Sequence, residues 1–460
     1  MSPNCLYELR CIDAMTTSTA LKRYLGRHIE PNLPNVPDNA LPWRNVLVIP
    51  VYAESPSLLE RLTKSLSGPH RVLVILVLNR PETENDSQCN QELRQLIKQQ
   101  TILSGTPSKL LKLNQYSDLY LYDMERISGP LSAKEGVGLA RKVGCDIALS
   151  WWHCGYIETP WICSSDADAT LPKDYFERLD SIPEKTAAAT FPFKHLSGLD
   201  DEVTQATLLY ELRLHHYVLG LDYAGSGYAH HTLGSALAIK CERYAQVRGF
   251  PKRAGGEDFY LLNKVAKTGP IERLSGHCIE LESRTSNRVP FGTGPAVGKI
   301  IAAGVEAEQA LFYHPQCFYA LRSVLESVPA LRTRSASELP LLLQDLLGQK
   351  LAQDSYEILV NLGIEKNLEH CIRQSQSEGQ FTRQFHQWFD GFRTLKFIHG
   401  LRGLGWHNQT LSDLSTAAPN LWPVQSDQIL EAQALRRAIQ KNWGWSIGKE
   451  ERSENLSRDY

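Results

Sequence analysis

Two short apolar segments near the start of the chain set the pattern of the fold. The sequence reads VLVIPV over 46–51 and VLVILVL over 72–78, with many β-branched residues in both segments. Such runs are typical of strands that are buried on both faces of a sheet. A helix start at Ser55 and Pro56 lies between them. Four leucines then share one helical face: Leu58, Leu59, Leu62 and Leu66. The order strand, helix, strand predicts a βαβ unit.

The same alternation continues to about residue 270. Strands are predicted at 119–122, 160–164, 187–192 and 235–240. Helices are predicted at 91–103, 134–149, 202–218 and 257–267, and Gly269 is a suitable stop for the last one. Alternating strands and helices predict an α/β fold. Ligands of such folds bind beyond the carboxyl ends of the strands, so the segments that follow the strands are the candidate functional sites.

The two ends of the chain have a different character. Residues 1–42 become rich in proline toward their end, which predicts an extended N-terminal arm. Beyond residue 300 the leucine-rich and aromatic stretches at 337–349, 355–363 and 380–398 have helical spacing. We therefore expect an α/β domain over 43–300, a mainly α-helical C-terminal domain over 301–450, and a flexible polar tail over 451–460.

Composition excludes several protein classes. The chain has 460 residues, 42% hydrophobic and 22% charged, and its formal net charge of −2 gives no overall attraction to nucleic acid. Ten cysteines are spread from Cys5 to Cys371 without a CxxC pair, as expected for reduced thiols. No apolar run approaches the length that spans a bilayer, and the N-terminus is not typical of a signal peptide. We expect a soluble cytoplasmic protein, either free or peripheral at the inner face of the membrane.

Asp166-Ala167-Asp168 directly follows the predicted strand at 160–164. Two carboxylates one residue apart can converge on Mg²⁺ or Mn²⁺, which completes its shell with phosphate oxygens and water. An acidic turn, with one Asp capping the next helix, is the alternative. The position after an apolar strand favours the metal site.

Gly255-Gly256-Glu257-Asp258 opens the predicted helix at 257–267. Carboxylates in a first helical turn are favourable to the helix dipole, and this is one interpretation. The other is a general base that accepts the proton of a hydroxyl nucleophile.

The ordered set of these motifs resembles glycosyltransferase family 2, whose catalytic domain has the GT-A fold, a Rossmann-like mixed sheet flanked by helices. The resemblance covers roughly 43–290. It assigns Pro50, Tyr52 and Glu54 to the nucleotide segment. Asp166 and Asp168 match the DxD motif that holds the metal and the diphosphate.

On the acceptor side, Glu257 and Asp258 match the ED pair, whose Asp is taken as the catalytic base. Residues 136–144, GVGLARKVG, resemble the family's G-x-x-x-A-R-N-x-G helix, which makes Arg141 a candidate for steering phosphate; a surface arginine is the alternative. His277 lies where some GT-A enzymes have a third metal ligand.

The sequence departs from this family pattern at four places. Ala53 stands where the family usually has Asn, and Lys142 replaces an Asn. The G-G-F turn before the ED pair is reduced to Arg248-Gly249-Phe250. Asn79 follows the second strand where many members have an Asp that contacts the base, so the donor nucleotide stays open. The basic segment 283–288 resembles a mobile loop that closes over the diphosphate; an exposed loop is the alternative.

The resemblance implies an inverting, metal-dependent glycosyltransferase, a hexosyltransferase that uses Mn²⁺ or Mg²⁺. Its partners would be a UDP-, GDP- or dTDP-sugar donor and a hydroxyl acceptor, which is a glycan, a lipid-linked or a small molecule. Two alternatives remain. A sugar-nucleotide pyrophosphorylase would carry a Gly-rich basic motif after the first strand, where this chain reads VYAESPS. The second alternative is a catalytically inactive scaffold protein that binds a nucleotide-sugar. The oligomeric state is open.

Overall fold

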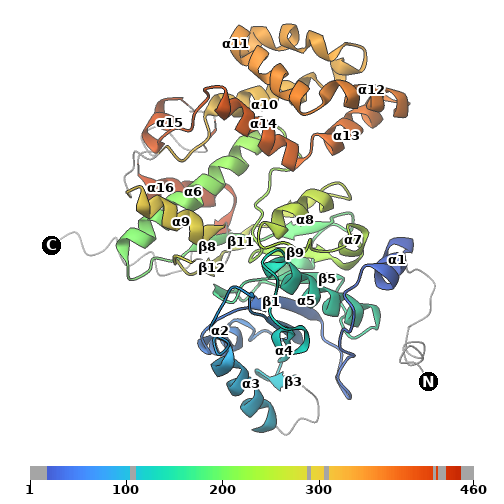
Figure 1. Ribbon diagram of the computed structural model, residues 1–460, viewed down its shortest axis with the longest axis vertical. Coiled ribbons are helices and arrows are strands. Elements are labelled where there is room, and N and C mark those ends of the chain that lie inside the picture. The colour runs from blue at the N-terminus through green and yellow to red at the C-terminus, as the bar shows by residue number, and fades with distance from the viewer. Residues whose placement is uncertain are drawn as a thin grey trace, which may run out of the picture. The chain divides into compact units, whose positions relative to one another are not determined.

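The computed structural model describes residues 18–103, 110–286, 292–304, 310–417, 421–422 and 431–446. These residues belong to two compact units (Figure 1). The first, the sheet unit, is drawn from Met1–Gly198, Thr232–Pro295 and Trp445–Tyr460. The second, the helical unit, is drawn from Leu199–His231 and Ala296–Gly444. The chain is therefore mixed α/β with a helical C-terminal region.

An eight-stranded sheet forms the centre of the sheet unit, in the order β10-β7-β9-β5-β1-β2-β4-β3. Its strands are β1 (Asn45–Val51), β2 (Val72–Leu78), β3 (Leu110–Lys112), β4 (Ser117–Asp123), β5 (Trp161–Ser164), β7 (Ala188–Thr190), β9 (Leu237–Lys240) and β10 (Ile271–Arg273). β1 pairs in parallel with β2 and β5, whereas β9 runs antiparallel to β5 and β7. The expected mixed sheet is confirmed, and every residue of β1 and β2 is buried.

Helices flank this sheet (Figure 1). They are α1 (Thr19–Arg27), α2 (Ser57–Ser65), α3 (Gln91–Leu103), α4 (Met124–Ser128), α5 (Gly136–His153), α7 (Cys241–Gln246) and α8 (Glu257–Val265), with a 3-10 turn at Glu177–Leu179. The predicted βαβ unit is present as β1, α2 and β2, and Leu58, Leu59 and Leu62 are its buried helix face. α5 packs on β1 and β2 so closely that a side chain at Gly144 would collide with Val48 and Val77.

Three further short strands form a small sheet in the order β6-β12-β8: β6 (Ala169–Thr170), β8 (Phe193–His195) and β12 (Ile279–Leu281). Leu281 pairs with Ala169, so the residues after β12 run beside Asp168. β11 (Gly276–His277) pairs with β13 (Trp445–Ser446). Within the small sheet, β6 and β12 pair although they are more than a hundred residues apart in the sequence.

The N-terminal region differs from the extended arm that the prolines predict, because Thr19–Arg27 form helix α1. Ser18 caps this helix by accepting a hydrogen bond from the backbone N–H of Leu21. Leu21 and Tyr24 are buried in the core that covers the sheet. Residues 1–17 lie outside the described part of the chain, as does the predicted tail over 451–460.

The helical unit comprises α6 (Asp201–Tyr223), α9 (Thr293–Ala302), α10 (Pro315–Ser327), α11 (Leu339–Asn361), α12 (Ile364–Gln374), α13 (Glu378–Trp388), α14 (Gly391–Gly403), α15 (Leu411–Ala417) and α16 (Ala432–Asn442), with 3-10 turns at Pro329–Arg332 and Ala336–Glu338. Helix α9 belongs to this unit from Ala296 onward. Its core is rich in phenylalanine, including Phe318 and Phe385. The division differs from the expected boundary at residue 300, since α6 belongs to this unit. No helix in the described ranges is long and apolar enough to cross a membrane.

Candidate functional site

Glu54 and the DxD aspartates come from segments that leave the same edge of the large sheet. β1 ends at Val51 and leads to Glu54, and β5 ends at Ser164 and leads to Asp166. Because β1 and β5 are parallel neighbours, both segments lie at their carboxyl edge. α8 begins with Glu257 directly after Gly256, whose φ of 66° is left-handed and suits glycine.

Arg141 of α5 joins the DxD segment to the ED pair. Its Nε donates to Glu257 Oε1 at 2.8 Å, and its Nη2 forms an ion pair with Asp166. Its Nη1 donates to Ser164 Oγ at 2.8 Å and to the carbonyls of Ser165 and Gly234 at 3.3 and 3.1 Å. The side chain is only 4% exposed. The alternative of a surface arginine is therefore excluded, and Arg141 fixes the two acidic motifs relative to each other.

Small residues allow this geometry. The N–H of Gly138 donates to the carbonyl of Arg253 at 2.9 Å, so the start of α5 lies against the loop that leads to Glu257. A Cβ on Gly138 would approach the Pro251 carbonyl oxygen to 2.5 Å. Gly234 is packed equally tightly, because a Cβ there would overlap the guanidinium of Arg141. Glycine at these two positions is a packing requirement of the site.

A second arginine, Arg284, contacts the other aspartate of the DxD segment. Its Nη2 is 2.8 Å from Asp168 Oδ2 and 3.2 Å from Glu54 Oε1. Arg61 of α2 steadies the same region, with 2.7 Å to Glu282 Oε1 and 2.8 Å to the carbonyl of Ala167. Arg284 belongs to the predicted basic segment 283–288, of which Asn287 and Arg288 lie outside the described part of the chain.

The acidic groups outnumber these cations. Within the described residues, the guanidiniums of Arg141 and Arg284 form ion pairs with four carboxylates, and the charge of a fifth, Asp258, interacts with Arg141. The five carboxylates exceed the two guanidiniums by three negative charges when all are ionised; they are Glu54, Asp166, Asp168, Glu257 and Asp258. We refer to these seven side chains as the carboxylate cluster. Like charges in a poorly solvated place favour the neutral acid, so at least one carboxyl should hold its proton more strongly than usual.

Two carboxyl groups show this effect. Burial, with help from the charges of Asp166 and Glu54, raises the pKa of Asp168 to about 6, although Arg284 opposes the shift. Burial and the charge of Glu257 raise the pKa of Asp258 to about 7, against the influence of Arg141 and of the Phe259 N–H, which donates to Asp258 Oδ1 at 2.7 Å. The cluster is thus short of positive charge near neutral pH.

The carboxylate cluster offers hard oxygen donors and carries too little positive charge for its acidic groups. Both features suit a divalent cation such as Mg²⁺ or Mn²⁺. In the ranges that the structure describes, no three His, Cys, Asp or Glu side chains converge to hold a metal ion. Asp166 and Asp168 would therefore supply part of the shell, as is usual for Mg²⁺, which is often held by one or two carboxylates together with phosphate and water. The two aspartates fit Mg²⁺ or Mn²⁺ on the condition that phosphate and water complete the coordination shell.

His277, the predicted third ligand, is placed differently from the two aspartates. It lies on β11 with its side chain 63% exposed, and its Nδ1 is 3.2 Å from Asp174 Oδ2. The contact that the structure gives it is thus with Asp174, and it has no described contact with Asp166 or Asp168.

The predicted nucleotide residues have mainly structural contacts. Pro50 is buried within β1. The hydroxyl of Tyr52 donates to Glu84 Oε2 at 2.6 Å. The Nδ2 of Asn79 donates to the carbonyls of Val51 and Val77 at 3.0 and 3.2 Å, which ties the ends of β1 and β2 together. Of the residues assigned to the nucleotide, Glu54 and Arg141 are the ones that join the carboxylate cluster along with the two aspartates.

Lys142, next to Arg141, points away from the cluster into a buried network. Its Nζ is 2.8 Å from Asp146 Oδ2 and 2.6 Å from the hydroxyl of Tyr24, and it donates to the carbonyl of His28 at 2.9 Å. The hydroxyl of Tyr244 donates to Asp146 Oδ1 at 2.9 Å. α5 therefore supports the site with one face and is anchored to α1 with another.

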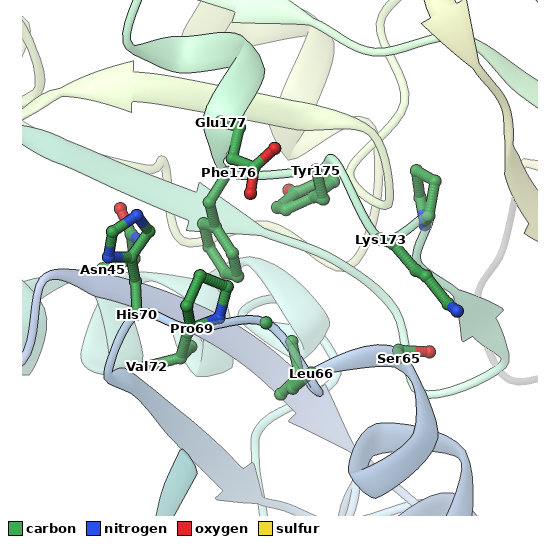
Figure 2. Close-up of a pocket in the computed structure, with 12 residues that line it drawn as sticks. Asn45, Ser65, Leu66, Pro69, His70, Val72, Lys173, Tyr175, Phe176 and Glu177 are labelled. Atoms are coloured by element: carbon green, nitrogen blue, oxygen red, sulfur yellow. The ribbon is translucent and has the colours of Figure 1, made fainter. Parts of the chain in front are cut away.

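One surface pocket, whose space of about 380 Å³ includes open solvent, lies elsewhere on the sheet unit (Figure 2). Its lining includes Asn45 and Val72, the first residues of β1 and β2, so it is at the opposite, amino-terminal edge of the strands. Figure 2 shows Pro69 and Phe176 beside each other in it. None of the carboxylate cluster lines this pocket.

Comparison with known proteins adds no family to this geometry. No family model matches the chain, and a search of curated proteins finds no match either.

Proposed function

We propose that this protein is an inverting, metal-dependent glycosyltransferase with a GT-A catalytic domain of the family 2 type. It would transfer a sugar from a UDP-, GDP- or dTDP-sugar to a hydroxyl group. The observation that supports this most is the carboxylate cluster, in which Arg141 binds the DxD motif and the ED pair at the carboxyl edge of the strands. A transferase of this kind needs a diphosphate site and a base next to each other.

The donor side of the reaction needs neutralisation of the diphosphate leaving group. Asp166 and Asp168 are the residues that would hold Mn²⁺ or Mg²⁺, and the cation would supply Lewis-acid stabilisation of the leaving diphosphate. Arg141 keeps Asp166 in place, because its buried guanidinium forms an ion pair with that carboxylate. Arg284 is 33% exposed, and its guanidinium can pair with phosphate oxygens.

The acceptor side needs a base for the hydroxyl proton. Asp258 is suited to this role because its raised pKa, about 7, lies close to the operating pH of most enzymes, where a base is most effective. Glu257 has its carboxylate 2.8 Å from Arg141 and acts as a positioning residue. With the base on the opposite side of the sugar from the leaving group, one in-line displacement would invert the anomeric carbon. No covalent intermediate on a second carboxylate is then needed.

A donor screen tests the proposal. The full chain is incubated with UDP-, GDP- and dTDP-sugars, Mn²⁺ and a panel of hydroxyl acceptors, and release of nucleoside diphosphate is measured. We expect turnover that EDTA abolishes and Mn²⁺ restores. Asp258→Asn should lower kcat by about 10²–10⁴-fold, the usual contribution of a general base.

Asp180→Asn is the matched control, since Asp180 is an exposed aspartate that pairs with Arg44. It should retain wild-type turnover. Turnover of Asp258→Asn at the wild-type rate would refute the base assignment. Binding of nucleoside diphosphate that is insensitive to both Mn²⁺ and Asp168→Asn would refute the metal site.

A further inference from the structure

The two arginines of the carboxylate cluster are held very differently. Arg141 is 4% exposed and makes hydrogen bonds or ion pairs to five groups, two of which are backbone carbonyls. Arg284 is 33% exposed, and the described residues that hold its guanidinium are two carboxylates, Asp168 and Glu54. Arg141 is a fixed part of the site. Arg284 has the features of a cation that can be exchanged.

We propose that Arg284 is a built-in counter-cation that occupies Asp168 and Glu54 until a divalent cation and a nucleoside diphosphate bind, and that its guanidinium then pairs with the diphosphate. This inference rests on the proposed function, because the same Asp168 would hold the cation.

The first argument comes from charge. Asp168 is 16% exposed, and the guanidinium that pairs with its Oδ2 also pairs with Glu54 Oε1. Arg284 supplies one positive charge at a distance of 2.8 Å. A divalent cation at Asp168 would meet that positive charge directly. The two cations must therefore compete for the carboxylate.

The second argument comes from the backbone, which is fixed directly before Arg284. Leu281 is paired in β12, and its carbonyl accepts a hydrogen bond from Leu196 N–H at 2.8 Å. The hydroxyl of Ser283 donates to the carbonyl of Leu196 at 2.5 Å. The exchange therefore requires only rotation of the Arg284 side chain about a fixed attachment point.

The third argument is the chemistry of the guanidinium. Its planar set of N–H donors matches two oxygens of a phosphate as well as it matches a carboxylate. A diphosphate that arrives with a divalent cation provides such oxygens beside Asp168. Arg284 should therefore weaken metal binding to the free protein and strengthen nucleotide binding to the metal-loaded protein.

Opposite effects on two ligands make this testable. Mn²⁺ binding to the full chain is measured by the electron paramagnetic resonance signal of free Mn²⁺, without nucleotide. Binding of UDP, GDP and dTDP is then measured by calorimetry at saturating Mn²⁺. Arg284→Gln should bind Mn²⁺ at least about fivefold more tightly, and its preferred nucleoside diphosphate at least about fivefold more weakly, which is the lower end of typical coupling between two ligands.

Two variants make the comparison specific. Arg44→Gln removes the same charge from a side chain of similar exposure, 35%, that pairs with Asp180, and it should change neither affinity. Arg284→Lys keeps the charge but loses the planar donors. It should therefore bind Mn²⁺ like the wild type and bind the nucleotide more weakly.

Each other outcome overturns the inference. If Arg284→Gln leaves the Mn²⁺ affinity unchanged, Arg284 does not compete with the metal. If it weakens Mn²⁺ binding, Arg284 is only a structural support of Asp168. If the wild type binds no Mn²⁺ with or without any nucleotide, the proposed function itself fails, and the exchange fails with it.

Discussion

Removal of Arg141 should destabilise the sheet unit far more than removal of Arg284, although both changes delete one positive charge from the same cluster. Arg141→Gln leaves the Glu257 carboxylate, 5% exposed, without its guanidinium. Deletion of one partner of a buried ion pair costs about 3–5 kcal/mol, because the remaining charge stays buried. Arg284→Gln breaks pairs that are partly open to water, for which about 0.2–1 kcal/mol is typical.

The assay must read the sheet unit separately from the helical unit. Urea titration of the full chain at pH 7.5, followed by hydrogen exchange of peptides from α5 and β5, does this because both elements lie in the sheet unit. We expect Arg141→Gln to lower the free energy of unfolding of these peptides by about 4 kcal/mol and Arg284→Gln by less than about 1 kcal/mol.

Arg141→Lys gives an intermediate test. A lysine keeps the charge and can reach some of the five groups, but its ammonium has only three donors and no fixed plane. We expect a loss of about 1.5–3 kcal/mol, the value of one hydrogen bond to a charged group. The reasoning would be refuted by a loss below about 1 kcal/mol for Arg141→Gln, or by equal losses for Arg141→Gln and Arg284→Gln.

Three further outcomes are expected. The value of kcat/KM should rise with pH through about 7, because Asp258 accepts a proton only when it is ionised. Glu257→Gln should move this rise to lower pH, because it removes a neighbouring negative charge. A pH–rate profile that is the same for Glu257→Gln and the wild type would contradict the assignment. Ala53→Gly should stabilise the chain by about 0.5–1 kcal/mol in urea titrations. The φ of Ala53 is 50°, and a left-handed conformation costs an alanine about 1–2 kcal/mol. A loss of stability in this variant would argue against backbone strain at Ala53. Gly138→Ala should lower the Tm and cost at least about 1–3 kcal/mol, because a Cβ there would approach a backbone atom to 2.5 Å. Gly26→Ala in α1 should raise the Tm, because a Cβ there has no atom within 4 Å and alanine favours a helix. Equal shifts of the two Tm values would contradict the packing argument.

The sequence was sufficient for the elements whose signal is local. β2 and α3 occur at the predicted residues, and β1 extends the predicted strand by one residue, because buried apolar runs and amphipathic periods decide them without reference to distant parts of the chain. α1 is the exception: Ser18 and the buried Leu21 and Tyr24 are a capped helix start. The nearby prolines drew the prediction to an extended arm, although they follow this helix.

Contacts between distant segments were beyond such reasoning. Arg284 reaches Glu54 across 230 positions, and only the pairing of β12 with β6 brings it beside Asp168. The sequence singles out the basic segment 283–288, but nothing local in it distinguishes Arg284 from Arg288. For the same reason, the sequence did not predict that Asn79 binds strand carbonyls or that His277 contacts Asp174. In contrast, the strand-end rule was enough to select Asp166 and Asp168 as candidates.

Two of the departures from the family pattern fall at residues with a left-handed backbone. Among the described residues, four non-glycine residues have a positive φ, and two of them are asparagines, which tolerate this conformation: Asn32, Asn39, Ala53 and Arg248. The other two, Ala53 at 50° and Arg248 at 68°, stand where the family pattern has asparagine and glycine. The chain keeps a left-handed backbone there although its residues disfavour it, and such strain persists only when the surrounding structure holds it. Ala53 lies beside Glu54, and the turn at Arg248 leads to the ED pair. At both places, which adjoin the proposed active site, the backbone has a conformation that asparagine or glycine adopts more easily than the residue that is present.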